Sequence, residues 1–515
     1  MQFLIEYVRH LGIFKAWRFQ RNARLYLISN ALGGVTTGIV LLLYNLYLVS
    51  LGYRADFIGV LLLVGTLGAG LAIFPAGACI DHFSGKAILI WSSLLIGVAG
   101  IGLFLFRQPI SLLVSSFVAG IGGAFLLVIN APFLTVNSTP AERPHLFSLN
   151  IALSLITTVL GKLIGGVLPI WFGAISWLMT PLSSWSVWLL ANQPDARSYQ
   201  LALLFAGIIA GPSLIPLFLM SDDQSRRGGG SREPWLRVSQ TLLPHKEPRR
   251  STLLPRATTF RGAAPPPDDG TVDKSVGHGA VRDVVARGEA GGGWALVGAS
   301  FWHVLRSPIV LLSLTQVLIG LGAGLFIPYF NIYFVQHLRA SSALFGLIDG
   351  SATAVVALFT LCAPWLATRV GKVNTIVLTE LASIPLLLVI GLTNILPLAA
   401  VLYLFRYSLM DMSSGIFQVF SMEAVPKDRR GLANSSYQAS YQVAWAVSAL
   451  LGGLVIVHLG YPPIFITAAV CYLLSIAVLW GCFGRGRRRQ FEQKGGTEEV
   501  KDHCSNRHCN SVTSS

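Results

Sequence analysis

Long apolar runs separated by short polar segments make up most of the chain and predict membrane-spanning helices. A helix needs about 20 mostly apolar residues in succession to cross the hydrocarbon core of a bilayer. Twelve runs approach that length, six in each half of the chain. The expected helices occupy 25–50, 57–79, 87–106, 110–136, 146–172 and 199–220 in the first half, and 308–336, 343–366, 374–393, 397–423, 432–458 and 462–483 in the second. The prediction is an all-α integral membrane protein with twelve transmembrane helices.

The second half of the chain repeats the first at a shift of 286 residues, and such a repeat sets the expected architecture. Asn45 and Asn331 stand at the same place near the ends of the first and seventh runs. Other pairs at this shift are Gly34 and Gly320, Gly38 and Gly324, Gly85 and Gly371, Lys86 and Lys372, and Gly166 and Gly452. We therefore expect two pseudo-symmetric six-helix bundles related by an axis along the membrane normal, a layout found in transporters.

The shift first fails after the fifth run, where residues 173–200 form an insertion without a counterpart in the second half. The insertion contains Trp177, Trp185 and Trp188. Tryptophan is favoured at the interface between membrane and water, so we expect the insertion at the outer surface.

The composition is that of a membrane protein. Of the 515 residues, 53% are hydrophobic and only 12% are charged, whereas a soluble protein has about 25% charged residues. The net charge of +15 does not indicate nucleic-acid binding, because the basic residues cluster in short segments between the apolar runs. Inner loops of membrane proteins collect Lys and Arg in this way.

The same clusters predict the orientation. With the N-terminus inside, nearly all of the 38 Lys and Arg residues fall on the inner side. The exceptions are Arg54, Arg107, Arg197 and Arg339 outside, and Lys162 and Arg406 within helices. Both termini are therefore predicted to be cytoplasmic, and we expect a multi-pass protein of the plasma membrane.

Three further segments complete the domain organisation. Residues 1–24 place apolar residues at intervals of three and four among Lys and Arg, which predicts an amphipathic helix on the inner surface. The bundles at 25–220 and 307–483 are joined by 221–306, whose Gly- and Pro-rich composition is typical of a disordered cytoplasmic linker. The linker would let the halves move relative to each other, and a regulatory role is the alternative. The tail at 484–515 is basic and polar.

The loop after the second run is similar to the signature loop of the major facilitator superfamily of secondary transporters. It reads Gly-Ala-Cys-Ile-Asp-His-Phe-Ser-Gly-Lys at 77–86, with Gly, Asp, Gly and a basic residue at the family's spacing. The resemblance covers the whole chain apart from the linker and the tail, and it implies the twelve-helix fold of the family. The residues expected in a gating loop are Gly77, Asp81, Gly85 and Lys86, with Gly371 and Lys372 in the second copy.

The residue types in this loop have a physical sense. Gly77 and Gly85 would permit a close helix approach and a tight turn, and Asp81 would accept hydrogen bonds from a helix N-terminus, whose dipole favours an anion. The second copy has Ala363 and Ala367 in place of the Gly and the Asp. A latch at Asp81 would therefore belong to one half only, and a loop that merely fixes topology is the alternative.

Charged residues within the runs are candidates for function, because a charge inside a membrane is costly. Lys162 lies near the middle of the fifth run, and Arg406 and Asp411 lie in the tenth. The resemblance to the family implies that these three could face the solute path. A salt bridge between Arg406 and Asp411 is the structural alternative, and a protonated Asp411 would be a proton carrier. Asp349 lies near the outer end of the eighth run, and Glu380 is expected to pair with basic groups of the inner loops.

The eleventh run has an aromatic and amide face. Tyr437 and Tyr441 are four residues apart and therefore lie over one another on a helix, and Gln438 and Gln442 form the adjacent row. We expect this face to point to the bundle interior and to suit a neutral or amphipathic organic solute, with interhelical hydrogen bonding as the alternative. The other neutral candidates for solute contact are Asn45 and Asn331.

These observations predict a secondary active transporter that moves a small organic solute by alternating access, with efflux slightly favoured over uptake. Proton or ion coupling is an open alternative. The sequence has no phosphate-binding Walker loop and no cluster of reactive groups at one depth, which disfavours ATP-driven transport and an enzyme. A membrane sensor or enzyme on a transporter-like scaffold is the other hypothesis. We expect no cofactor, no metal site and no nucleic-acid partner, and we expect a monomer.

Overall fold

The computed structural model describes residues 19–139, 142–180, 190–221, 307–426 and 430–484, and these ranges contain helices and no strand. The predicted linker beyond residue 221, the tail beyond residue 484 and the first 18 residues of the predicted interfacial segment lie outside the described residues. The last residues of that segment, from Arg21, form the first turn of a long helix. The all-α prediction is confirmed.

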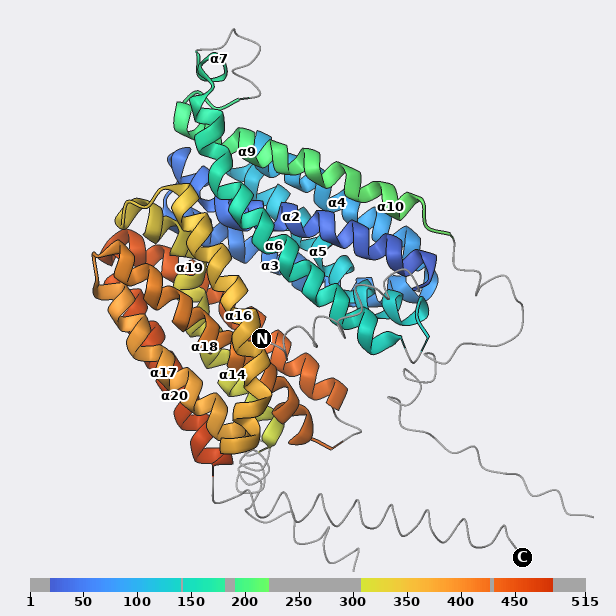
Figure 1. Ribbon diagram of the computed structural model, residues 1–515, viewed down its shortest axis with the longest axis vertical. Helices are drawn as coiled ribbons and strands as arrows, with labels where there is room; N and C mark the ends of the chain where they lie inside the picture. Colours follow the sequence, from blue (N-terminus) through green and yellow to red (C-terminus); the bar gives the residue numbers. More distant parts are fainter. Residues whose placement is uncertain (1–18, 140–141, 181–189, 222–306, 427–429, 485–515) are drawn as a thin grey trace, which may run out of the picture. The chain divides into compact units, whose positions relative to one another are not determined.

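The described residues of the first half form six long helical segments (Figure 1). They are α2 (Arg21–Ser50), α3 (Ala55–His82), α4 (Gly85–Leu105), α5 (Pro109–Val136), α6 (Arg143–Ala174) and α9 (Pro194–Ala210), the last continued by α10 (Leu214–Phe218). A single turn of helix, α7 (Ser176–Met179), lies in the insertion.

Six helical segments are likewise described between residues 307 and 484 of the second half (Figure 1). They are α14 (Pro308–Phe326) with its continuation through α15 (Phe330–Ile332), α16 (Ser342–Val370), α17 (Lys372–Leu392), α18 (Leu396–Glu423), α19 (Arg430–Leu459) and α20 (Pro462–Phe483). All twelve predicted runs are therefore helical, and most helices extend a few residues beyond the run. The extension follows from the membrane, where main-chain groups must find hydrogen bonds within their own segment.

Within the described residues, 11 helices are long and apolar enough to cross a membrane. The helix α18 is not among them, although its 28 residues give it sufficient length. Its middle carries Arg406 and Asp411, and these two charged residues lower its hydropathy. The predicted tenth span, α18, is thus set apart from the other described helices by its charges.

Two helical segments are interrupted, which the apolar pattern does not predict. A 3-10 turn, η2 (Gly211–Ser213), separates α9 from α10. In the second half a 3-10 turn, η4 (Ile327–Tyr329), follows α14, and a π-helical turn, η5 (Tyr333–His337), follows α15. Proline removes a main-chain donor and clashes with the preceding turn, yet the prolines at 75, 132, 169, 364 and 385 lie inside unbroken helices. Proline alone therefore does not determine where a helix breaks.

The helices of each half pack in corresponding pairs. In the first half α2 packs against α6, and in the second α14 packs against α19 (Figure 1). The equivalent glycines Gly38 and Gly324 lie at these two crossings. A Cβ on Gly38 would lie 2.3 Å from the carbonyl oxygen of Thr158, and a Cβ on Gly324 would lie 2.3 Å from that of Trp445. The repeat in the sequence therefore reflects equivalent helix crossings, at which small residues let two backbones approach.

The buried apolar side chains form three clusters with different memberships. The largest draws on both halves, from Leu42 and Tyr47 on α2 to Tyr403 on α18 and Phe465 on α20. The two smaller clusters each belong to one half, and both lie where the helices approach the predicted cytoplasmic side. The halves thus share one core toward the predicted outer side and have separate cores toward the other.

A buried arginine joins the two described parts of the insertion. Arg197, at the start of α9, is 4% exposed, and its guanidinium donates to the carbonyl oxygens of Ala191 (2.9 Å), Leu178 (3.1 Å) and Thr180 (2.9 Å). Trp177 is 72% exposed, and the two other tryptophans lie outside the described residues. Arg197, which the sequence predicts on the outer side, therefore binds main-chain carbonyls on both sides of residues 181–189.

A bulky residue at position 38 should destabilise the protein because it separates α2 from α6. We expect Gly38→Leu to cost at least about 1–3 kcal/mol, the usual cost of overpacking, and to lower the thermal midpoint in detergent. Gly33→Leu is the matched control, since a Cβ at Gly33 in the same helix meets nothing within 4 Å. Equal melting of the two variants would show that the crossing does not require glycine.

Candidate functional site

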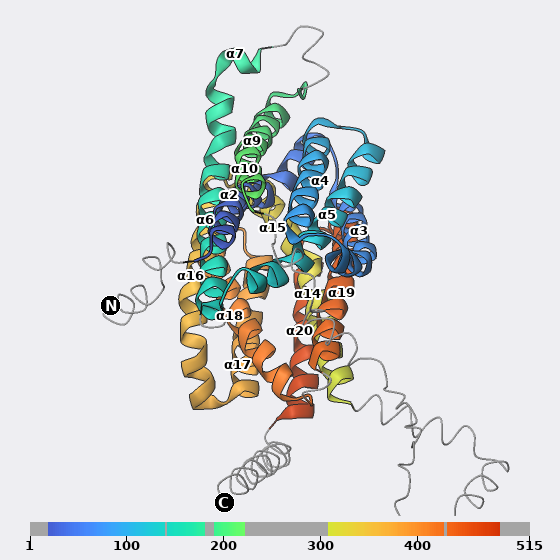
Figure 2. The same ribbon diagram turned by 90° about the vertical axis from the view of Figure 1, so that its right-hand side faces the viewer.

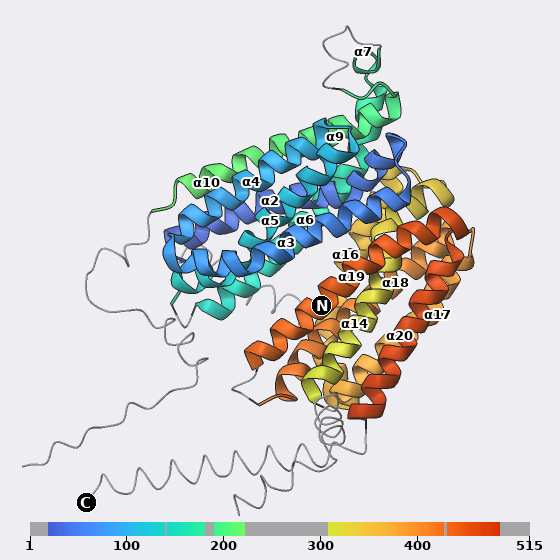
Figure 3. The same ribbon diagram turned by 180° about the vertical axis from the view of Figure 1, so that it is seen from behind.

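The two halves contact each other through two helix pairs related by the repeat. One pair is α6 with α16, which run side by side in Figure 2, and the other is α3 with α19, seen in Figure 3. At the first pair the Ser342 hydroxyl donates to the Gly166 carbonyl oxygen (3.0 Å). At the second, the Tyr329 hydroxyl lies between the carbonyl oxygens of Ala449 (2.5 Å) and Ala55 (3.4 Å). These contacts join opposite halves near the predicted outer ends of the helices.

A buried ion pair crosses the first of these contacts. Lys162 on α6 is 6% exposed, and its Nζ lies 3.0 Å from Oδ2 of Asp349 on α16. The same Nζ donates to the Thr353 hydroxyl (2.9 Å), and Asp349 Oδ1 accepts from the Tyr403 hydroxyl of α18 (2.9 Å). Because a buried charge is tolerated only when it is paired and hydrogen-bonded, these four side chains form one unit that spans the two halves.

The local sequence explains how α16 presents this unit. Asp349 and Thr353 are four residues apart, so they lie over one another on the same face of the helix. The Thr353 hydroxyl also donates to the Asp349 main-chain carbonyl (2.9 Å), which fixes its side chain. The repeat has no second copy of the pair, since Ser448 is the counterpart of Lys162 and Leu63 that of Asp349. The ion pair therefore makes the two sides of the interface chemically different.

Two asparagines make a reciprocal contact at the centre of the interface. The Asn45 side-chain amide donates to the Pro328 carbonyl oxygen (2.7 Å), and the Asn331 amide donates to the Leu42 carbonyl oxygen (3.1 Å). At the shift of 286, Asn45 corresponds to Asn331 and Leu42 corresponds to Pro328. The two hydrogen bonds are thus related by the pseudo-symmetry axis, and the one to Pro328 lies in the broken part of the seventh segment.

Near the predicted outer ends, two tyrosines lie in links outside the spans. Burial raises the pKa of Tyr461 to about 12, and its ring contacts Tyr333 edge-on at 5.0 Å between centroids. Burial also raises the pKa of Tyr53, whose hydroxyl donates to the Arg107 carbonyl oxygen (2.5 Å). Both phenols are therefore neutral at physiological pH, so their contacts do not depend on ionisation.

The hypothesis of an Arg406–Asp411 salt bridge is wrong for the described part of the chain, where no ion pair joins the two. Arg406 is 1% exposed, its guanidinium lies 4.4 Å from the centroid of the Phe326 ring, and it donates to the Tyr472 hydroxyl at 3.4 Å. Asp411 is exposed on the same helix. The two lie on different faces because five residues correspond to about 500° of helix rotation.

The pairing expected for Glu380 is also wrong. Glu380 is 2% exposed on α17, and among the described residues it forms no ion pair with a basic group. Instead the basic partner near that end of the second half is Lys372, which pairs with Glu423 at the end of α18. Lys372 begins α17 and Glu423 ends α18, so the two side chains meet where these packed helices terminate, whereas Glu380 is buried two turns further along α17.

The residues of the predicted aromatic and amide face of α19 differ in their exposure. Tyr437 is 4% exposed and packs edge-on against Phe417, in agreement with an interior position. Tyr441 is half-buried, and Gln438 and Gln442 are exposed. A contact of these residues with a solute stays a prediction.

The residues expected in the gating loop lie at the end of α3 and the start of α4, and at the turn between α16 and α17. Gly371 has a φ of 92°, which only glycine adopts without strain, so the chain makes a tight turn at this position of the second copy. At Gly77 the expected close approach is wrong, because a Cβ would meet nothing within 4 Å. Gly85 begins α4, with Ser84 as its N-cap, and Lys86 follows it. The side chain of Asp81 lies outside the described residues.

Sequence reasoning identified Lys162 but not its partners. In the sequence Asp349 is only a charge near the end of a run, and no pattern points to Thr353 or Tyr403. A signal existed, because Lys162 is a lysine within an apolar run of the first half and the apolar runs of the second half contain candidate acidic partners, among them Asp349 and Asp411. The sequence alone does not say that the fifth and eighth segments are neighbours.

Comparison with known proteins agrees with this architecture. The sequence profile of the Major Facilitator Superfamily matches residues 26–303 and 312–509. No curated protein sequence matches the chain.

Several solved structures share the fold. One is a bacterial homolog of the human lysosomal transporter Spinster in an inward-facing, occupied conformation, with 13% identity, coverage of 89% of this chain and 96% of that one, and a TM-score of 0.62. A bacterial homologue of the iron transporter ferroportin in an inward-facing state has 14% identity, coverage of 90% and 99%, and a TM-score of 0.60. A D-xylose–proton symporter has 14% identity, coverage of 90% and 99%, and a TM-score of 0.57.

The profile match extends over both halves of the chain, and the structural similarity covers nearly the full length of each transporter. The helical repeat, the membrane-spanning segments and the contacts between the halves all fit the fold of these proteins. The chain therefore belongs to the major facilitator superfamily.

Proposed function

We propose that the protein is a secondary active transporter that moves a small organic solute across the plasma membrane by alternating access. The observation that carries the proposal is the buried Lys162–Asp349 ion pair, which joins the two halves on one side of their interface. In alternating access the contacts that close one side must break when that side opens. A charged pair suits this role, because both partners are stabilised by each other when buried and by water when separated.

The magnitudes favour a two-state device over a permanent structural bridge. Removing one partner of a buried ion pair costs about 3–5 kcal/mol, because the other charge is left without compensation, whereas the intact pair adds little net stability. A pair at this place therefore does more to specify a conformation than to stabilise the protein. Opening the outer side would hydrate Lys162 and Asp349 together, so neither charge would be left buried without its partner.

We further propose that the conformation described above is closed on the outer side, with both termini cytoplasmic. Three features support this proposal: the shared apolar core toward the predicted outer side, the separate cores toward the predicted cytoplasmic side, and the reciprocal asparagine contacts. Two structurally similar transporters are described as inward-facing. The outer contacts would then be the ones that break during the cycle.

A proton gradient is a suitable energy source, and efflux remains slightly favoured over uptake. Protonation of Asp349 would remove the charge that compensates Lys162, and it would thereby favour the state in which water reaches the lysine. The structurally similar D-xylose transporter is described as a proton symporter. The exposed Asp411 is a second candidate for the proton, and Tyr441 and Gln442 are candidates for solute contact.

Transport itself is tested by counterflow in proteoliposomes against a panel of neutral, anionic, cationic and zwitterionic organic solutes at two pH values. We expect at least one solute to exchange, with a rate that falls in Lys162→Met and in Asp349→Asn. Asp195→Asn is the control, since Asp195 is an exposed carboxylate on the outer side of the first half. Absence of exchange for the whole panel in the parent protein would contradict the proposed function.

Loss of either charge should open the outer side. We expect Asp349→Asn to raise the outward-open fraction at least about tenfold, since about 1.4 kcal/mol suffices for that change and the lost pair exceeds it. Double electron–electron resonance between spin labels at Gln108 and Ile395 measures the outward-open fraction as a population of longer distances. Both residues are exposed and lie on predicted outer links of opposite halves. The swapped pair, Lys162→Asp with Asp349→Lys, should restore short distances. If the single and swapped variants give the same distances, the pair does not control closure.

The two asparagines should contribute equally to closure. Asn45→Ala and Asn331→Ala each remove one hydrogen bond between the halves, which is worth about 0.5–1.5 kcal/mol, and each should shift the same spin-label distances toward the open population by a similar amount. Asn150→Ala is the matched control, because the hydrogen bond between Asn30 and Asn150 lies within the first half (2.8 Å). If the control variant, or only one of the two asparagine variants, opened the outer side, the two asparagine contacts would not contribute equally to closure.

A further inference from the structure

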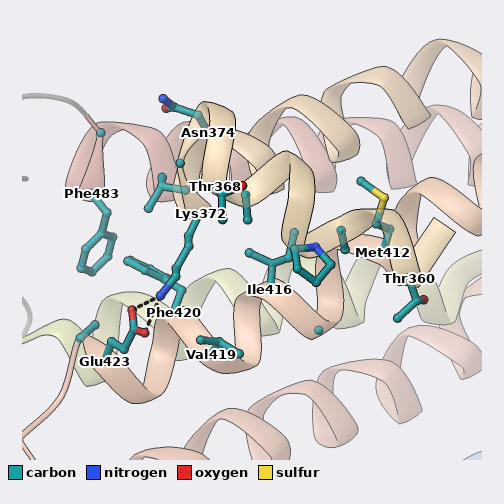
Figure 4. Close-up of a pocket in the computed structure, with 18 residues that line it drawn as sticks. Thr360, Thr368, Lys372, Asn374, Met412, Ile416, Val419, Phe420, Glu423 and Phe483 are labelled. Atoms are coloured by element: carbon teal, nitrogen blue, oxygen red, sulfur yellow. Dashed lines mark hydrogen bonds and ion pairs between the residues drawn. The ribbon is translucent and has the colours of Figure 1, made fainter. Parts of the chain in front are cut away.

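A cavity of about 870 Å³ lies in the second half near the predicted cytoplasmic side. Its walls come from the last turns of α16, the start of α17, the last turns of α18 and the end of α20 (Figure 4). All of its lining residues belong to the second half, and the Lys162–Asp349 unit is not among them. We call this cavity the inner pocket.

The walls of the inner pocket are largely apolar, and small residues provide its space. Met412, Ile416 and Phe420 contribute apolar surface from α18, and Ala363 lies opposite on α16. Gly415 leaves the wall open, because a Cβ there would meet nothing within 4 Å. A cavity of this size and character matches sites that enclose an organic molecule, which are usually about 300–1,000 Å³ with a few polar groups.

The two charged groups of the inner pocket, Lys372 and Glu423, lie together at one end, whereas Thr360 lies near Met412 at the other (Figure 4). The Lys372 ammonium donates to both carboxylate oxygens of Glu423, at 2.6 Å to Oε2. The two side chains are 39% and 54% exposed. An exposed ion pair is worth only about 0–1 kcal/mol, so a ligand that offers its own charges can replace this contact at low cost.

The charges at this end select among possible ligands. A purely anionic ligand on Lys372 would leave Glu423 without its partner and would be repelled by it, and a cationic ligand would do the same to Lys372. A neutral ligand would gain only apolar contact. A zwitterion satisfies both side chains, since its anionic group binds Lys372 and its cationic group binds Glu423.

We propose that the inner pocket binds a zwitterionic amphiphile, with the apolar body between α16 and α18 and the charged head at Lys372 and Glu423. That this molecule is the transported solute rests on the proposed function, whereas its binding does not. The inference thus gives the solute a chemical class, which the residues at the interface of the halves do not specify.

Binding is tested with the full-length protein in nanodiscs and radiolabelled dodecylphosphocholine, with empty nanodiscs as background. We expect saturable binding to the parent protein. Gly415→Leu should weaken it at least about tenfold, or about 1.4 kcal/mol, because the leucine fills the pocket without a clash. Gly481→Leu is the matched control, since Gly481 lies on α20 outside the pocket and also meets nothing within 4 Å. Equal binding by the two variants would overturn the proposal.

Three competitors with the same dodecyl chain test the head group: dodecyl phosphate, dodecyltrimethylammonium and dodecyl maltoside. In the parent protein all three should compete less well than unlabelled dodecylphosphocholine. Glu423→Gln should improve competition by dodecyl phosphate, and Lys372→Gln should improve competition by dodecyltrimethylammonium, because each removes the unfavourable charge. Dodecyl maltoside that competes as well as the zwitterion would show that no charged head is recognised, which contradicts the proposal.

Uptake of the labelled probe into proteoliposomes separates the inner pocket from the proposed function. Saturable binding that Gly415→Leu abolishes, without uptake, would support the site but exclude the probe class as the solute. Uptake that is unaffected by Gly415→Leu would support transport but overturn the role of the pocket. The thermal midpoint of each variant and the spin-label distances at Gln108 and Ile395 verify that the variants are folded.

Discussion

A lysine buried in a membrane must be compensated, and in this protein the compensating carboxylate comes from the other half of the molecule. Lys162 and Asp349 are separated by almost two hundred residues of sequence, and they meet because α6 and α16 pack side by side. Thr353 and Tyr403 complete the hydrogen bonding of the pair from the second half alone. The interface between the halves therefore depends on a contact that one half cannot make without the other. The relative position of the two halves is thereby linked to the charges of Lys162 and Asp349, and a proton or other ion that neutralises one of these charges would affect that position.

The interface is symmetric in its framework and asymmetric in its chemistry. The framework consists of equivalent helix pairs and of the reciprocal contacts made by Asn45 and Asn331, all of which follow from the repeat. The asymmetry lies in the ion pair, because its counterparts, Ser448 and Leu63, carry no charge. The inner pocket adds a second difference, since it is lined by the second half alone. In a transport cycle built on this scaffold, both halves would open and close through equivalent contacts. The ion pair and the inner pocket would each act at one place without a counterpart in the repeat.

The architecture could be predicted from the sequence because its signals are local or regular. Apolar runs reveal the helices, and a constant shift relates Gly38 to Gly324 across the two halves. The site could be predicted only in part. Lys162 stood out as a charge in an apolar run, but its partner depends on which segments become neighbours, and that is a property of the tertiary structure. Pro328 lies in a broken segment and its carbonyl oxygen accepts from Asn45 of the other half, whereas Pro75 lies in an unbroken helix, so the contact rather than the residue type distinguishes them.

The most direct test of the account asks from which side the buried unit can be reached. Thr353→Cys, in a protein whose native cysteines are replaced by serine, places a thiol beside Lys162, and a membrane-impermeant thiol reagent is then added to one side of oriented vesicles at a time. The account predicts that the thiol is reached from one side at a time and that Asp349→Asn increases labelling from the outer side. Simultaneous access from both sides, or labelling from the outer side that is insensitive to Asp349→Asn, would contradict alternating access controlled by this ion pair.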